Sequence, residues 1–295
     1  MNKSIIKMLS GAVLLATAAT AQAREVDESI DAASDGQVEI INISGSVEVF
    51  GWSRDAVEVT GELGDKVEEL VLERNGDKVL VKVKVPRNNS SNISSDLVIR
   101  VPEDSSIDVS TVSADITVED VGGVQSLHTV SGDVITEAAG SDVSAQAVSG
   151  DVEVTGDGGA AETMANTVSG DVSITGVSGA VGAEAVSGDV MVQGGSFERA
   201  NLNTVNGEID FLAGLEDGGR LTVESVNGDV DIRFDDGVSA RFDIETFNGD
   251  IDNCFGPEAE RTSKYAPGWE LRFTQGDGDG RVNISTLNGD IDLCQ

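Results

Sequence analysis

Histidine, cysteine, proline and basic side chains are all scarce in this chain, and the shortages exclude several classes of protein. Its 295 residues include one histidine, two cysteines and four prolines. One histidine and two cysteines are too few for the four nitrogen and sulfur ligands of a structural zinc site. Only 19 residues are basic, whereas 53 are acidic. This surplus repels phosphate backbones, so we expect no nucleic-acid partner.

Long apolar runs are also missing, apart from a short one near the start. Lys3 and Lys7 precede an uncharged stretch, and residues 21–23 read Ala-Gln-Ala. This order is typical of a secretory signal peptide. The stretch is shorter than the roughly 20 residues that span a bilayer, and no cysteine follows it for lipidation. We predict that residues 1–23 are removed and that the protein is exported to the periplasm or cell surface without spanning a membrane.

The remaining chain keeps 17 basic and 53 acidic residues. Chains as acidic as this are often disordered. Here 39% of the residues are hydrophobic, and Val, Ile and Leu recur in short alternating runs that can bury apolar surface. The sequence therefore predicts an ordered all-β fold with an acidic surface.

One short motif, Val-Ser-Gly-Asp-Val with close variants, recurs nine times. Counted at its glycine, or at the alanine that replaces it in the first copy, it lies at residues 114, 132, 150, 170, 188, 207, 228, 249 and 289. A period of about 19 residues indicates a repeat architecture.

Apolar residues occupy fixed places around this glycine. Positions +2 and +4 are apolar, as at Val152 and Val154, which is the alternation of a β-strand. Positions −5 and −2 are apolar too, as at Ala145 and Val148, and −3 is Thr, Ala or Ser. A straight strand cannot turn all three inward, so we expect a bulge near −3 to −2 and place the −2 residue in the core.

Two architectures account for these units. Each unit can be one coil of a parallel β-helix, or β-solenoid, in which equivalent residues stack about 4.8 Å apart. Alternatively, Ser-Gly or Asn-Gly forms the turn of an antiparallel hairpin, in a row of hairpins or a β-prism. The constancy of the motif favours the solenoid, because stacking constrains every position of a coil.

The chain divides into the signal peptide and two further regions. Residues 24–102 alternate as strands with less regular spacing, which suggests a variant β cap over the open end of the solenoid. Residues 103–295 form the repeat solenoid. Within it, residues 255–285 interrupt the repeat as an excursion, in which residues 270–274 and 281–287 read as the two arms of a hairpin.

The two cysteines occupy the same repeat position. Cys254 and Cys294 each lie five residues after a repeat glycine. Two coils apart, their backbones would be separated by about 9.6 Å, beyond the roughly 7 Å limit for a disulfide. If the excursion leaves them on adjacent coils, they can bond. We predict a disulfide between them, as is usual in an exported protein.

An acidic residue follows the glycine in every copy, and stacking would place these carboxylates in a file. Such a file suggests calcium as a cofactor, because calcium prefers several oxygen ligands. Alternatively, each Asp accepts backbone hydrogen bonds in its turn. The candidate calcium ligands are Asp133, Asp151, Asp171, Asp189, Asp229 and Asp250.

No catalytic constellation stands out. His128 lies in an alternating strand, where a surface role is the simpler interpretation than a Ser-His-Asp triad. The Gly-Asp-Gly-Asp-Gly run at residues 276–280 lacks the lysine of a phosphate loop. Tyr265 and Trp269 lie in the excursion, and we regard them as candidate ligand-binding residues because loops on a rigid scaffold often carry function.

The order of several segments resembles an exported bacterial β-strand-repeat family named "putative adhesin", a domain of unknown function. The resemblance covers nearly all of the chain after residue 23 and is carried by the repeats together with Gly51-Trp52, Val57–Gly61, Leu97–Pro102 and Thr286–Ile291. It implies a β-helix-like fold and an envelope location, and it brings no catalytic residues. We therefore expect a non-enzymatic adhesin or scaffold that presents an acidic solenoid face to a protein or glycan. The alternatives are a calcium-dependent structural module and a polysaccharide-processing enzyme.

Overall fold

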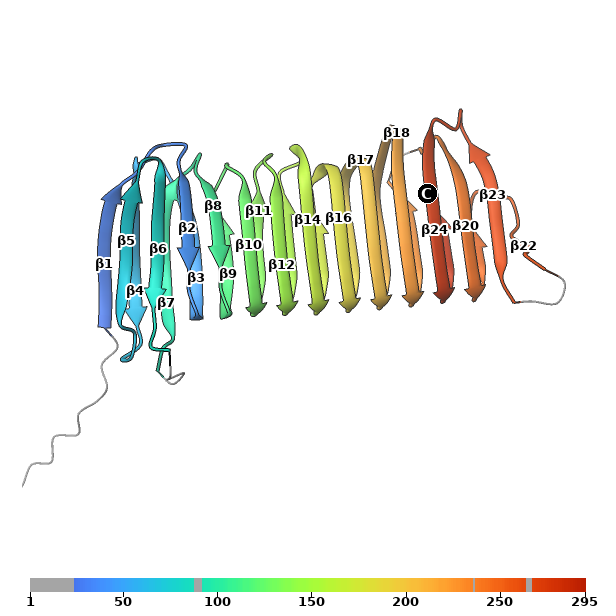
Figure 1. Ribbon diagram of the computed structural model, residues 1–295. Coiled ribbons are helices and arrows are strands. Elements are labelled where there is room, and N and C mark those ends of the chain that lie inside the picture. The colour runs from blue at the N-terminus through green and yellow to red at the C-terminus, as the bar shows by residue number, and fades with distance from the viewer. Residues whose placement is uncertain (1–23, 88–91, 236, 264–266) are drawn as a thin grey trace, which may run out of the picture.

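The computed structural model describes residues 24–87, 92–235, 237–263 and 267–295. Every regular element in these ranges is a β-strand, and Figure 1 shows the strands as an elongated stack of short rungs. Across the ranges described, no helix has the length and apolar character needed to cross a membrane. The protein is thus all-β and solenoid-like. The predicted signal peptide lies outside the described residues.

The strands fall into three groups along the chain. The N-terminal group comprises β1 (Arg24–Asp31), β2 (Gln37–Ile41), β3 (Ser44–Trp52), β4 (Ala56–Leu63), β5 (Glu69–Asn75), β6 (Lys78–Lys84) and β7 (Ser95–Pro102). The middle group comprises β8 (Ser106–Ser110), β9 (Ser113–Glu119), β10 (Gln125–Ser131), β11 (Val134–Ala138), β12 (Val143–Ser149), β13 (Val152–Gly156), β14 (Ala160–Ser169), β15 (Val172–Thr175), β16 (Ser178–Ser187), β17 (Val190–Asn206) and β18 (Ile209–Asn227). The C-terminal group comprises β19 (Val230–Phe234), β20 (Ala240–Asn248), β21 (Ile251–Asn253), β22 (Glu260–Arg261), β23 (Trp269–Gln275), β24 (Gly280–Asn288) and β25 (Ile291–Cys294).

Each repeat contributes one strand before its glycine and one after it, and the two belong to different ladders. The first ladder pairs β8, β10, β12, β14 and β16 in parallel, and continues through the C-terminal halves of β17 and β18. The second pairs β9, β11, β13 and β15 in parallel, and continues through the N-terminal halves of β17 and β18 to β19. The glycine therefore marks a corner between ladders, not the turn of an antiparallel hairpin.

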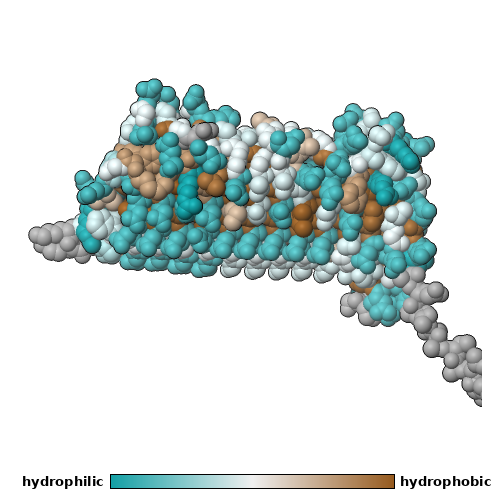
Figure 2. Space-filling model, turned by 180° about the vertical axis from the view of Figure 1, so that it is seen from behind, coloured by the Kyte–Doolittle hydropathy of each residue, from teal (hydrophilic) through white to brown (hydrophobic). Residues whose placement is uncertain are grey.

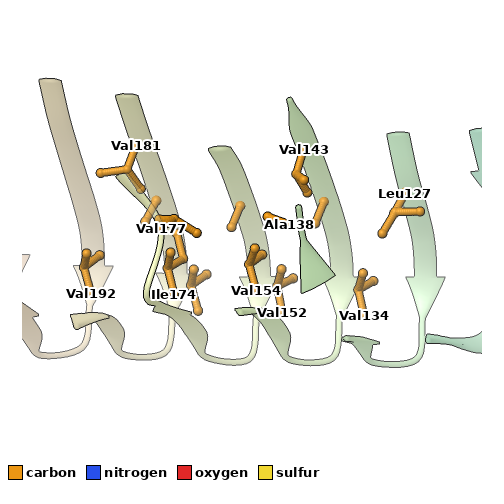
Figure 3. Close-up of a cluster of buried hydrophobic side chains, with 14 of the residues drawn as sticks. Leu127, Val134, Ala138, Val143, Val152, Val154, Ile174, Val177, Val181 and Val192 are labelled. Carbon is orange, nitrogen blue, oxygen red and sulfur yellow. The ribbon is translucent and has the colours of Figure 1, made fainter. Parts of the chain in front are cut away.

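The core lies between the two ladders. Positions −5 and −3 of the first ladder and positions +2 and +4 of the second face inward. Figure 3 shows this arrangement for Leu127 of the first ladder and Val134 and Val152 of the second. These side chains are nearly inaccessible to water. Toward the C-terminal coils the core gains a column of aromatic rings, Phe197, Phe211, Phe234, Phe242 and Phe273, with neighbouring centroids 4.4 to 6.1 Å apart.

The repeat glycine is required by the close approach of successive coils. A Cβ atom placed on Gly150 would lie 2.0 Å from the carbonyl oxygen of Gly132 in the preceding coil. The φ angle of Gly150 is also +142°, a conformation that residues with side chains rarely adopt. The same contact recurs at the other repeat glycines, which explains why the motif keeps this residue.

The first and last coils of the chain are not the ends of the stack. In the N-terminal part, β2 pairs with both β6 and β8, and β3 pairs with both β7 and β9. In the C-terminal part, β24 lies between β18 and β20, and β25 lies between β19 and β21. Each terminal coil is thus inserted between two coils that follow one another in sequence, and Figure 1 shows β24 in this place.

The prediction that residues 270–274 and 281–287 pair as a hairpin is wrong. β23 pairs antiparallel with one edge of β20, and β24 pairs parallel with the other edge. A tight turn can form a hairpin only between strands that pair with each other, and here β20 separates the two. A short antiparallel hairpin does form, but between β22 and β23.

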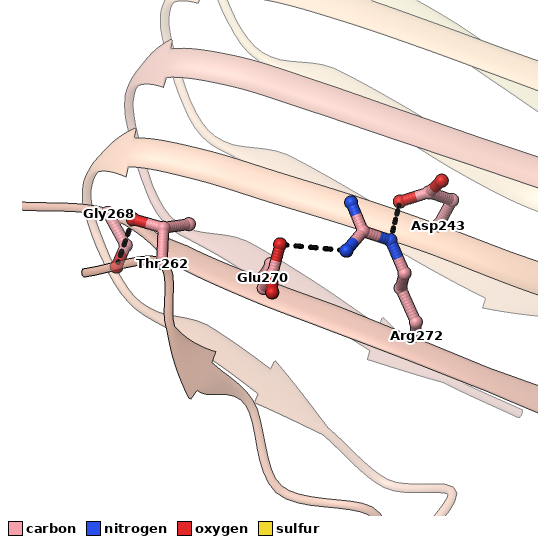
Figure 4. A network of polar contacts seen from close by, with 5 residues as sticks. All are labelled: Asp243, Thr262, Gly268, Glu270 and Arg272. Carbon is pink, nitrogen blue, oxygen red and sulfur yellow. Dashed lines mark hydrogen bonds and ion pairs between the residues drawn. The ribbon is translucent and has the colours of Figure 1, made fainter.

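Antiparallel strands lie at both ends of the described stack. At one end β1 pairs with β4, β4 with β7, and β5 with β6. At the other end β23 covers β20. Arg272 of β23 donates to Asp243 of β20 at 3.0 Å and to Glu270 at 2.9 Å (Figure 4), which helps to hold this outer strand.

The predicted disulfide is confirmed. Cys254 and Cys294 are bonded, and their Cα atoms are 5.0 Å apart. The cysteines lie on adjacent coils, as the spacing requires, but the coil that ends at Cys294 lies on the inner side of the coil that carries Cys254. The bond therefore fastens an inserted coil to the outermost one.

Candidate functional site

An apolar ridge runs along the outer surface of the first ladder. It consists of the −2 residue of the nine repeats counted from residue 114 onward, each between 38% and 49% exposed. Its members are Val112, Val130, Val148, Val168, Val186, Val205, Val226, Leu287 and Phe247. Because β24 is inserted before β20, Leu287 lies between Val226 and Phe247 in the stack. Nine aliphatic or aromatic side chains on consecutive coils thus form one line.

The ridge corrects the expectation that the −2 residue lies in the core. Strand alternation continues past −3, so −3 faces inward and −2 faces outward, and the corner comes only at the glycine. The −3 hydroxyls compensate for their burial by hydrogen bonding to the carbonyl of a neighbouring corner, as Thr167 does to Gly150 at 2.9 Å and Thr204 to Gly188 at 3.1 Å. The predicted bulge near −3 is therefore unnecessary.

A shallow groove follows the ridge. Its cavity measures about 890 Å³ and is lined by five ridge residues, Val148, Val168, Val186, Val205 and Val226. Along the groove, the −4 side chains are mostly polar or acidic: His128, Gln146, Asn166, Glu184, Asn203, Glu224 and Ser285. His128 Nε2 lies 3.1 Å from Ser126 Oγ. The oxygen Oδ1 of Asn166 is buried and makes no hydrogen bond within the part of the chain that the structure describes.

The predicted carboxylate file exists, and its members are linked through the backbone. From Asp115 to Asp189, one carboxylate oxygen of each Asp accepts the N–H of the equivalent residue in the next coil, as between Asp133 and Asp151 at 2.9 Å and between Asp171 and Asp189 at 2.8 Å. Asp229, Asp290 and Asp250 continue the same pattern. This arrangement satisfies the carboxylates between coils rather than within one turn. In Figure 2 a band of hydrophilic residues follows the lower edge of the molecule.

The file does not gather into a metal cluster. Among the described residues, no group of three or more His, Cys, Asp or Glu side chains is arranged to hold a metal ion. The candidate calcium ligands, Asp133, Asp151, Asp171, Asp189, Asp229 and Asp250, lie one per coil. Calcium binding by the file stays a prediction.

A second carboxylate row makes the C-terminal part of this surface denser in charge. Asp210, Asp231, Asp292 and Asp252 occupy position +3 on four adjacent coils. Partial burial, followed by repulsion from Asp231, raises the pKa of Asp210, although Arg233 opposes the shift. Burial and neighbouring carboxylates raise the pKa of Glu208 and of Asp292 as well.

Of the two aromatic residues proposed as ligand contacts, Trp269 is not among the residues that line the groove. Trp269 is half-buried at the start of β23, and the guanidinium of Arg261 covers its ring at 4.5 Å from the centroid. This internal cation–π contact occupies one face of the ring. Tyr265 lies outside the described residues. A ligand role for either residue stays a prediction.

A comparison of sequences identifies the family. The family model described as Toastrack DUF4097 matches residues 37–294. This chain belongs to the Toastrack DUF4097 family. In sequence, the match begins at the coil of β2 and β3 and ends at the coil of β24 and β25. The Toastrack region therefore comprises nearly the whole described stack.

Solved structures similar to this Toastrack chain come from Bacteroides, Parabacteroides and Clostridium species. A "putative adhesin" from Bacteroides fragilis is 9% identical, with a TM-score of 0.48, and the match covers 92% of this chain and 98% of that one. A "putative adhesin" from Parabacteroides distasonis is 13% identical, with a TM-score of 0.45 and the same coverage. A "putative lipid binding protein" from Parabacteroides distasonis is 14% identical, with a TM-score of 0.39, covering 91% and 96%. No curated protein matches the chain.

Sequence reasoning missed the ridge, although a signal for it was present. Position −3 holds small or hydroxyl-bearing residues and −5 is apolar, which is the inward set of one regular strand. An apolar residue at −2 then has to face outward. The coil of β2 and β3 was also missed as a repeat, although Ile43-Ser44-Gly45-Ser46-Val47 matches the motif with Ser in place of Asp.

Proposed function

We propose that this protein is a non-enzymatic binding and scaffold protein of the bacterial envelope, and that a protein partner docks along the apolar ridge. The observation that carries the proposal is the unbroken line of nine exposed apolar side chains. Soluble proteins rarely leave so long an apolar line in contact with water unless another molecule covers it.

The ridge can supply useful binding free energy. Covering a half-exposed valine contributes about 1 kcal/mol, roughly half of the value for a fully buried aliphatic side chain. A partner that spans five coils would gain on the order of 5 kcal/mol from apolar contact, before the costs of association. The groove adds polar groups that can fix the orientation of the partner, including the side chains of Gln146 and Asn203.

Charge selects the kind of partner. The chain carries a formal net charge of −34, and Glu184 and Glu224 lie in the groove beside the ridge. A second copy of the chain would bring an equal negative charge to this face, whereas a basic protein with exposed apolar side chains complements it. The ridge is aliphatic apart from Phe247, so it lacks the row of aromatic rings on which sugars stack.

The proposal also includes the type of solenoid, its division into regions and its export. The repeats wind as a parallel β-helix with coils of about 19 residues, and residues 24–102 act as its N-terminal cap. Residues 103–295 form the solenoid that presents the ridge and the acidic edge. The disulfide supports export to an oxidising compartment, where residues 1–23 would serve as the signal peptide.

Site-specific photo-crosslinking in living cells tests the docking surface. A photoreactive residue at Val148 or Val186 should crosslink to one protein partner. The same residue at Met191, which is 44% exposed on the second ladder, is the matched control and should give no such product. The purified partner should then bind the parent protein and lose at least tenfold in affinity for Val186→Asp.

Three outcomes would contradict this assignment. Crosslinking that is equal at Val186 and Met191 would show that the ridge is not the contact surface. Partner binding that is insensitive to Val186→Asp would do the same. Crosslinking only to glycan material would reject a protein as the occupant.

A further inference from the structure

A row of four arginines crosses the C-terminal coils, far along the strands from the ridge. Arg199 of β17 pairs in register with Arg220 of β18, Arg220 with Arg281 of β24, and Arg281 with Arg241 of β20. All four are exposed, and each is followed by a buried residue of the core. They therefore point outward from four consecutive coils, and Arg241 and Arg281 lie next to the first residues of β20 and β24.

This arginine row exists only because the last coil is inserted. In sequence order the coil of Arg241 follows that of Arg220, and Arg281 comes last. In the structure β24 lies between β18 and β20, so Arg281 occupies the place that completes an uninterrupted row. On the preceding coils the same position holds Val124, Asp142, Glu162 and Ala180.

The four guanidinium groups have no partner within the described chain. None of them forms an ion pair or a side-chain hydrogen bond with another described residue. Arg100 and Arg233, by contrast, each pair with a carboxylate. Like charges on adjacent strands repel each other, so four unpaired guanidinium groups in one row favour an anion from outside.

A small cavity lies within this row. It measures about 180 Å³ and is lined by Arg220, Arg241 and Arg281 together with Gly218, Gly278, Gly280 and Asp279. This is about the volume of six water molecules, enough for one tetrahedral oxyanion. A Cβ on Gly278 would lie 3.3 Å from Cγ of Arg241, so the glycine leaves room for that side chain beside the cavity.

We propose that the arginine row binds a phosphate group, either free or as part of a lipid headgroup. The planar guanidinium matches the oxygens of a phosphate in a bidentate geometry, and three such groups converge on one cavity. A long polyanion is disfavoured, because its remaining length would leave the row and meet the negative charge of the rest of the chain. At physiological salt this repulsion is screened only over about 8 Å, so the ligand is compact.

Titration calorimetry of the full mature protein with inorganic phosphate and pyrophosphate tests the site, alongside flotation with vesicles of phosphatidylcholine with or without phosphatidic acid. Arg281→Gln removes the central guanidinium and should weaken binding about tenfold, the loss expected for one hydrogen-bonded charge. Arg281→Lys keeps the charge but not the forked geometry, so its affinity should lie between those of the parent and Arg281→Gln. Arg233→Gln is the matched control and should bind like the parent.

Calorimetry and flotation together distinguish a free phosphate from a lipid headgroup. Binding of phosphate or pyrophosphate in solution that Arg281→Gln weakens supports a free phosphate ligand. Flotation that requires phosphatidic acid and is weakened by the same variant supports a lipid headgroup. Absence of both, or equal losses for Arg281→Gln and Arg233→Gln, overturns the proposal. Because Arg281 is exposed, its variants should unfold at the temperature of the parent, which separates lost binding from lost folding.

Discussion

Two substitutions four residues apart test whether the −2 position is a surface position. Val226 lies on the ridge and is 38% exposed, whereas Val230 is 1% exposed and lies between Ile209 and Ile291 in the second ladder. Both are valines of the same repeat, and both can be changed to aspartate. The pair differs chiefly in the direction in which the side chain points.

The expected costs differ several-fold. At Val230 the new carboxylate would be buried without a partner, which should cost on the order of 4 kcal/mol even if it stays protonated. At Val226 the carboxylate stays in water, and the protein loses only the partial burial of a valine, about 1 kcal/mol. For a domain of this size, each kcal/mol of lost stability lowers the thermal unfolding midpoint by roughly 2–4 °C. Val230→Asp should therefore lower this midpoint by about 10 °C.

Thermal unfolding followed by circular dichroism measures both variants. Val226→Thr and Val230→Thr serve as controls, because threonine has nearly the shape of valine and carries no charge. If Val226→Asp lost as much stability as Val230→Asp, the ridge would be buried in the folded protein. The ridge proposal would then fail together with the corrected register.

Three other predictions concern the disulfide, the carboxylate rows and calcium. Replacing Cys254 and Cys294 with serine should lower the free energy of unfolding by about 4 kcal/mol, measured by urea unfolding, because the bond closes a loop with a sequence separation of 40. A parent protein whose urea midpoint is the same with and without reductant would contradict this. The raised pKa of Asp210 means that the folded state binds its proton more tightly than the unfolded state, so this group lowers stability above its folded pKa and ceases to do so as the pH falls below the unfolded value. Asp210→Asn should therefore unfold at higher urea than the parent at neutral pH, and the difference should vanish near pH 3; a difference that does not depend on pH would refute the assignment. Millimolar calcium should raise the thermal midpoint more than sodium chloride of equal ionic strength if the file that contains Asp133 binds the ion, and equal shifts would reduce the file to hydrogen-bonded carboxylates.

Much of the fold follows from local patterns. The recurrence of glycine with apolar +2 and +4 residues predicts stacked β-coils, because in-register stacking brings each glycine against the carbonyl of its equivalent, as at Gly150 and Gly132. The shared repeat position of Cys254 and Cys294 predicts that their coils are adjacent, and the bond confirms it. These features depend on one coil and its neighbour, which a periodic sequence specifies directly.

The carboxylate file shows where residue type alone was insufficient. The sequence places one acid per coil, but calcium ligation and backbone hydrogen bonding require the same residues at the same spacing. In the structure most of these carboxylates accept an N–H from the next coil, as Asp133 and Asp171 do. Which oxygen meets which donor depends on the offset between coils, and that offset is a property of the assembled ladder.

The sequence by itself determined the repeat, the all-β class, the inward +2 and +4 positions and the pairing of the cysteines. Only the tertiary structure decided that the −2 residues face water, that the terminal coils are inserted into the stack, and that Arg281 lies between Arg220 and Arg241. Because the coils are nearly identical, each has strand edges that can pair with many of the others. The repeat therefore predicts how one coil pairs with an adjacent coil, but not which coils become adjacent. The order of the coils is set by long-range contacts, including the Cys254–Cys294 bond and the strands that cover both ends.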